Sequence, residues 1–128
     1  MSYYFAKTVK APFAEAIDKV TAALKARGFG VLTTIDVQAT MKAKLGVDFR
    51  PYMILGACNP TFAFKALTAE DKIGTMLPCN VIVQELGPDT IEVAAVDPIA
   101  SMRGVENVEL ASIAGDVRDL LRQTVESL

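Results

Sequence analysis

Histidine and tryptophan are absent from this chain of 128 residues, which contains only two cysteines. The absence of histidine excludes Ser-His-Asp and Cys-His catalytic sites and histidine-ligated zinc, and it removes the commonest general base. Two cysteines do not make a disulfide scaffold, and in the cytoplasm they stay reduced. An enzyme built on this chain must therefore use Asp, Glu, Lys, Tyr or Cys, or a bound cofactor.

Long apolar runs and runs of basic residues are missing as well. The near-apolar stretch 52–58 is far too short to span a bilayer, and residues 1–7 lack the charged head and long apolar middle of a signal peptide. The 13 basic and 15 acidic residues leave a formal net charge of −2, with no basic run to neutralise phosphates. We therefore expect a soluble, cytoplasmic protein that binds neither nucleic acid nor a membrane.

The length of the chain predicts one domain, residues 1–128, with a real core. Hydrophobic residues make up 52% of the chain and charged residues 22%, which is a globular composition with a slight apolar excess. In so short a chain, apolar surface that the core does not use tends to be used at a subunit interface.

Hydrophobic periodicity predicts five strands and two main helices. Alternating or β-branched runs indicate strands at 2–9, 29–35, 52–58, 79–86 and 90–96. Apolar residues three or four apart indicate helices at 12–28 and 107–128. Shorter helical segments are expected after Asp36, Asn59 and Asp97, which precede them as caps or turn residues, and at 71–76.

This order predicts an α+β fold: strand, helix, four strands with short helical insertions, then a helix. A mostly antiparallel sheet with both main helices packed on one face buries the apolar stripes of the helices. The strands at 52–58, 79–86 and 90–96 are apolar on both faces, so the other sheet face needs a cover as well. We predict that a second copy of the chain supplies it and that the protein is a homodimer.

Two of the glycines inside predicted elements, Gly56 and Gly115, indicate specific packing. Gly56, within the strand at 52–58, indicates a bulge or a close approach of another part of the chain. Gly115, within the last helix, costs roughly 1 kcal/mol relative to alanine and suggests close packing there.

A repeated Cys-Asn dipeptide is the strongest indication of a site. Cys58-Asn59 ends one predicted strand and Cys79-Asn80 begins the next. If these strands pair antiparallel, the two thiols and two amides lie at the same end of the sheet and face one small pocket.

Three interpretations of the cysteines stay open. Both are small buried apolar residues, with the asparagines as caps. Alternatively they form a thiol site, either a redox pair or a nucleophile activated by the helix that begins at Pro60. In the third, Cys58 and Cys79 bind a soft metal ion such as zinc, which needs further ligands from Asp, Glu or a second chain.

Charged residues near these strands give a second candidate site. Asp48 and Arg50 lie in the loop before the strand at 52–58, and Asp36 is nearby in sequence. They bind an anionic ligand, or they form a salt bridge that fixes the loop. A further set of large apolar residues lines an apolar ligand pocket or belongs to the core: Phe62, Phe64, Met76 and Met102.

Several of these segments resemble a family of bacterial and archaeal proteins, "domain of unknown function 302". The resemblance rests on residues 35–40, 44–52, 54–60, 77–81 and 96–98, which read IDVQAT, KLGVDFRPY, ILGACNP, LPCNV and VDP. It implies an α+β fold like one repeat of the TATA-box-binding protein (TBP), without implying DNA binding. It brings no established activity, so it assigns no catalytic residue.

Together these patterns favour a homodimeric module that binds or senses a small ligand or a metal ion. Its site comprises Cys58, Asn59, Cys79 and Asn80, with Asp36, Asp48 and Arg50 as further candidates. The alternative is a thiol-dependent enzyme or redox protein that uses Cys58 or Cys79. A third is a structural partner in a larger assembly, which works through its sheet face.

Overall fold

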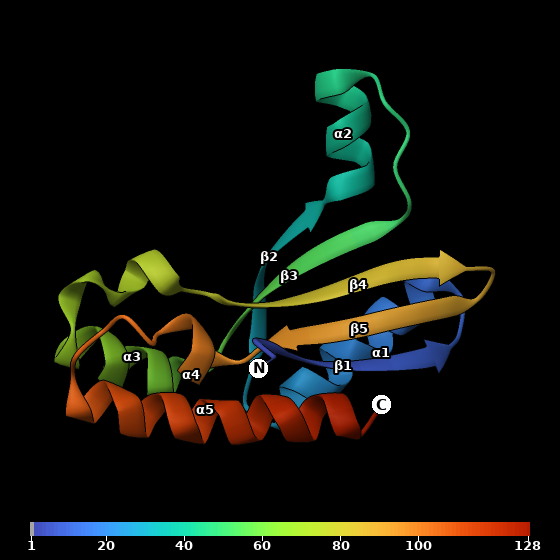
Figure 1. Cartoon of the computed structure of the whole chain (residues 1–128). Coiled ribbons are helices and arrows are strands. Elements are labelled where there is room, and N and C mark those ends of the chain that lie inside the picture. The colour runs from blue at the N-terminus through green and yellow to red at the C-terminus, as the bar shows by residue number, and fades with distance from the viewer. Residues whose placement is uncertain (1) are drawn as a thin grey trace.

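The computed structural model describes residues 2–128 and confirms the expected order of elements (Figure 1). The elements are β1 (Tyr4–Lys10), α1 (Phe13–Ala26), β2 (Gly30–Asp36), α2 (Val37–Leu45), β3 (Tyr52–Cys58), α3 (Pro60–Ala69), the 3-10 helix η1 (Asp71–Met76), β4 (Cys79–Gly87), β5 (Thr90–Val96), α4 (Pro98–Ser101) and α5 (Val108–Glu126).

The five strands form one antiparallel sheet in the order β1-β5-β4-β3-β2, so the predicted α+β class is confirmed. The main helices α1 and α5 lie on the same side of the sheet (Figure 1). Within residues 2–128, no helix has the length and apolar character needed to cross a membrane.

The core lies between the sheet and these two helices. It consists of the apolar stripes of α1 and α5 and the alternate residues of the three central strands: Ala16, Val20, Leu24, Val117, Leu121, Val125, Leu55, Ala57, Val81, Val83, Ile91, Val93 and Ala95. Each of these side chains is less than a tenth exposed. The spacing of three or four in the helices and of two in the strands is what aligns them.

The ends of α1 and α2 follow from local chemistry. Gly28, with φ +86°, ends α1, and Phe29 N donates to Leu24 O at 3.0 Å, the bond expected of a Schellman motif. The carboxylate of Asp36 begins α2 by accepting a hydrogen bond from Ala39 N at 2.9 Å, and Gly46 ends it at φ +66°.

The segment from β2 through α2 to β3 forms an arm that rises away from the layer of α1 and α5 (Figure 1). No residue of α2 is buried. We call residues 33–53 the arm. It is held by the pairing of β2 with β3 and by Gln38, whose Nε2 donates to Phe49 O at 3.0 Å.

Gly56 and Gly115 differ in what surrounds them. Gly56 pairs with Thr33, just after a bulge in β2, and a Cβ at Gly56 would collide with Thr33 Oγ1 and Pro78 Cγ. The predicted close approach at Gly56 is therefore confirmed. The close packing expected at Gly115 is wrong, because a Cβ there would meet no atom within 4 Å.

We predict that Gly56→Ala lowers the free energy of unfolding by about 1–3 kcal/mol, because its methyl group must displace Thr33 or Pro78. Denaturant titration measures the change. Gly30→Ala is the matched control, because a Cβ at this neighbouring strand position meets nothing within 4 Å. Equal destabilisation by both substitutions would contradict the packing argument.

Candidate functional site: an apolar cavity beside two cysteines

A cavity of about 310 Å³ lies where the ends of β3 and β4 meet α3, η1, α4 and α5. Almost all of its lining is apolar, and the residues that face it come from every one of these elements. They are Phe29, Leu32, Ala57, Cys58, Asn59, Phe62, Ala63, Ala66, Leu67, Gly74, Leu77, Pro78, Cys79, Pro98, Met102, Leu110, Ile113, Ala114 and Val117.

Strand pairing brings the two cysteines to this cavity. β3 and β4 are antiparallel, with Ala57 opposite Cys79, so Cys58 is one residue from the partner of Cys79. The structure thus places both cysteines at the same end of the sheet. Both line the cavity, Cys79 as a buried residue and Cys58 as a half-buried one.

The two thiols differ in environment. Burial, with a smaller contribution from the charge of Cys58, raises the pKa of the Cys79 thiol from 9.0 to about 11. Cys79 is therefore a neutral thiol at physiological pH, which makes it a weak nucleophile. Cys58 is the more accessible of the two.

Asn59 caps a helix and also lines the cavity. Its Oδ1 accepts a hydrogen bond from Phe62 N at 3.4 Å and so caps α3. Its Nδ2 would lie 3.0 Å from a Cβ at Gly28, so the carboxamide packs against this glycine. The predicted cap is confirmed, and the same side chain is the one amide in the lining.

The expectation that Asn80 faces the same pocket is corrected. Asn80 is exposed and lies opposite Gly56 in the sheet. Successive residues of a strand point to opposite faces, so Asn80 lies on the face opposite that of buried Cys79. It is not among the residues that line the cavity.

The other three candidates lie in or beside the arm and do not line the cavity. Asp36 caps α2. Asp48 forms an exposed ion pair with Lys42, with 3.2 Å between Nζ and Oδ1. The structure therefore favours the interpretation in which charged residues fix the loop.

Arg50 is held by its neighbours on the sheet and the loop. Its Nε donates to Gln84 Oε1 at 2.8 Å, and its guanidinium lies over the rings of Phe49 and Tyr52, at 4.5 and 5.5 Å from their centroids. These contacts orient Arg50 along the start of β3, away from the cavity.

Of the large apolar residues proposed as pocket lining, Phe62 and Met102 line the cavity, whereas Phe64 and Met76 are exposed. The sequence interpretation missed the contribution of α5, which supplies the residues Leu110, Ile113, Ala114 and Val117. A signal was available: the apolar stripe of α5 continues along its 19 residues from Leu110 to Val125, so its first turns also present apolar side chains. Its first half extends past the sheet and packs on α3 and α4 (Figure 1).

A metal ion would find few protein ligands here. Within the described residues 2–128, no group of three or more His, Cys, Asp or Glu side chains lies close enough together to hold one. Zinc in proteins takes four ligands, and one chain offers two thiols at this cavity.

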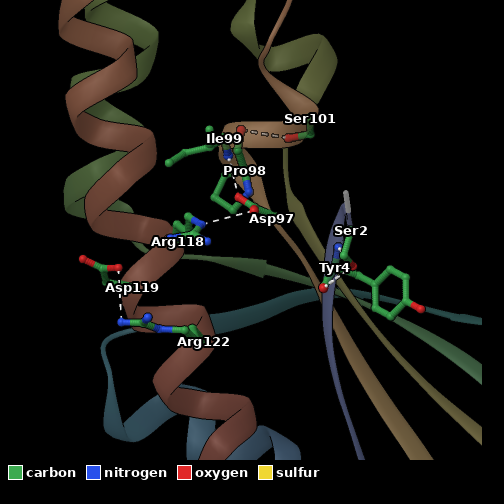
Figure 2. Close-up of polar contacts among 9 residues, drawn as sticks. All are labelled: Ser2, Tyr4, Asp97, Pro98, Ile99, Ser101, Arg118, Asp119 and Arg122. Carbon is green, nitrogen blue, oxygen red and sulfur yellow. Dashed lines mark hydrogen bonds and ion pairs between the residues drawn. The ribbon is translucent and has the colours of Figure 1, made fainter.

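A partly buried ion pair fixes the wall made by α4 and α5. Figure 2 shows Asp97 between these helices, with Oδ1 accepting from Ile99 N at 3.0 Å and Oδ2 accepting from Arg118 Nε at 3.1 Å. Asp97 thus caps α4 and ties the end of β5 to α5. Pro98, the next residue, lines the cavity.

Fold and cavity together define a small α+β domain with a partly open apolar site at one end of its sheet. The chain belongs to the family described as "Domain of unknown function DUF302", whose model matches residues 5–128. The resemblance inferred from its sequence segments is therefore confirmed.

A solved structure supports the same conclusion. The crystal structure of an uncharacterized conserved DUF302 protein from Bacillus stearothermophilus is similar, with a TM-score of 0.89 and 28% sequence identity over 98% of each chain. None of the curated proteins matches this chain.

We predict that the Cys79 thiol ionises near pH 11, so folding is destabilised as the pH rises. The unfolded chain ionises this thiol near pH 9 and the folded chain does not, so the stability present below pH 9 is lost up to about pH 11, by about 2–3 kcal/mol. The difference in thiolate absorbance between the parent and Cys79→Ala cancels the signals of Cys58 and the tyrosines and measures the titration of Cys79. A midpoint at or below pH 9 would contradict the assigned burial.

We predict that Asp97→Ala lowers the free energy of unfolding by about 2–4 kcal/mol, because it removes a cap and leaves Arg118 without its carboxylate. Asp97→Asn keeps an acceptor for the cap and should cost roughly half as much. Asp48→Ala, which breaks an exposed pair, is the control and should change stability by less than about 0.5 kcal/mol. Similar losses for Asp97→Ala and Asp48→Ala in denaturant titration would exclude this role.

Proposed function

We propose that this protein binds a small apolar molecule in the cavity beside Cys58, Asn59 and Cys79. The observation that carries the proposal is the cavity itself, whose volume of about 310 Å³ is at the lower end of the range for ligand sites. An apolar cavity of roughly 150 Å³ accommodates a benzene ring. A fused or substituted aromatic compound about twice that size would therefore fit.

The polar groups of the lining are few, as expected of a site that selects an apolar ligand. The thiol of Cys58 and the carboxamide of Asn59 are half-buried and can orient one polar atom of the ligand. Cys79 adds a neutral, polarisable sulfur to the wall. These features support binding or sensing in preference to turnover.

The alternative function is that of a thiol-dependent enzyme or redox protein, and Cys58 would be its reactive thiol. The raised pKa of the Cys79 thiol disfavours its use as a nucleophile. A soft metal held by Cys58 and Cys79 has less support than an apolar ligand, because it would need ligands from outside the set of groups around the cavity.

Two further inferences accompany this proposal. The order strand-helix-four strands-helix is compatible with a fold related to one TBP repeat, and this likeness concerns fold alone. Two free thiols fit a reducing compartment, which supports the cytoplasm as the location.

Binding of N-phenyl-1-naphthylamine, an uncharged dye that fluoresces in apolar surroundings, tests the proposal. We expect saturable binding to the native protein, and we expect Ala63→Phe to weaken it at least tenfold because the new ring occupies the cavity. Ala22→Phe on the exposed face of α1 is the matched control and should bind as the parent does.

Thermal stability separates occupancy from surface adsorption. A ligand that enters the folded cavity raises the melting temperature of the parent and of Ala22→Phe, and leaves that of Ala63→Phe unchanged. If the dye binds the two variants equally, the site is elsewhere. If no binding occurs to a folded parent protein, the apolar-ligand proposal fails.

A further inference from the structure

The sheet face opposite α1 and α5 carries a continuous apolar row. Register pairs place one residue from each strand side by side along it: Ile35, Ile54, Ile82, Ala94 and Ala6. None of the five is fully buried, and Ile35 is 49% exposed. Within residues 2–128, the main helices all lie on the other side of the sheet or beyond its end (Figure 1).

The arm is equally uncovered, and it continues this surface. Ile35 belongs both to the apolar row and to the arm, and its partner Ile54 directly follows the last residue of the arm. The arm also exposes Leu45 at 69% and Val47 at 45%, and no residue of α2 is buried. A short helix without a buried side chain obtains little stability from its own sequence, so it gains from a surface to pack against.

We propose that a second copy of this chain covers this surface, so that the arm of each protomer lies against the sheet face of its partner. Each protomer then contributes the same surface patch to the contact, as a two-fold interface requires. Each protomer supplies a projecting part, the arm, and a flat part, the apolar row.

The charges on this face fit a second copy better than a charged partner. Arg50 Nε donates to Gln84 Oε1 at 2.8 Å, and Gln84 Nε2 donates to Glu92 Oε1 at 2.8 Å. One positive and one negative charge are thus joined through a single amide, and Lys10 Nζ donates to Thr90 Oγ1 at 2.7 Å. Like surfaces meet across a two-fold axis, so the offset of Arg50 by Glu92 reduces self-repulsion within this patch.

The size of the surface is also adequate. Five strands about 4.8 Å apart and seven residues long at about 3.3 Å per residue cover roughly 550 Å². The two flanks of the arm add a few hundred square ångströms, which brings each protomer to about the 800 Å² of a standard stable interface.

Light scattering during gel filtration at micromolar concentration tests the assembly. We expect twice the chain mass of 13.7 kDa for the parent. Leu45→Glu on the arm and Ile82→Lys on the sheet face should each raise the dimer dissociation constant by about a hundredfold or more, because each buries an unpaired charge. Phe64→Glu, which changes an apolar side chain that is 74% exposed on α3, is the matched control and should stay dimeric.

Hydrogen exchange locates the contact. In the parent dimer, amides of α2 should exchange more slowly than in Leu45→Glu, and dilution should abolish this protection. A monomeric parent overturns the proposal. A dimer that Phe64→Glu disrupts, or whose α2 exchanges alike at every concentration, also overturns it, because the interface then lies elsewhere. The outcome is independent of dye binding, since these variants leave the cavity lining unchanged.

Discussion

The antiparallel register of β3 with β4 is the constraint on which the rest of the structure depends. Because Ala57 lies opposite Cys79, the chain leaves the sheet after Cys58 and returns to it at Cys79 from the same end. Everything between these points, α3 and η1, must then fold back over that end. The cavity is the space between this excursion and α5, so its position follows from one pairing register.

Much of the fold could be read from the sequence, because its elements are specified locally. The stripe of α1 and the caps at Asp36, Asn59 and Asp97 depend on neighbours a few residues away, and each is as expected. The site was harder to predict. Cys58 and Cys79 were found because a repeated dipeptide marked two strand ends, whereas the residues of α5 had no such mark and carry the same apolar pattern as core residues. The prediction for Asn80 is wrong because successive residues of a strand point to opposite faces of the sheet. Cys79 points to the face with the cavity, so Asn80, one position later, points to the open face.

Polar groups are used in the same way at both ends of the sheet. Near the cavity, Asn59 caps α3, and Asp97 caps α4 and joins β5 to α5 through Arg118 (Figure 2 shows Asp97 and Arg118). Most of the cavity lining is therefore left to apolar side chains. At the arm, Asp48 and Arg50 are bound to neighbours on the surface. Polar residues thus fix the framework of both regions, and the apolar surfaces between them are left available.

The helix α5 belongs to both apolar clusters of the molecule. Val117, Leu121 and Val125 pack in the main core, Leu110 packs with Ala66 and Ile73 at the cavity end, and Ile113 contacts both groups. Because one helix packs in both clusters, a change in packing at the cavity end also affects how α5 packs in the main core. A ligand bound in the cavity would therefore stabilise a helix that the main core also needs, and its binding would add to the free energy of unfolding of the whole domain.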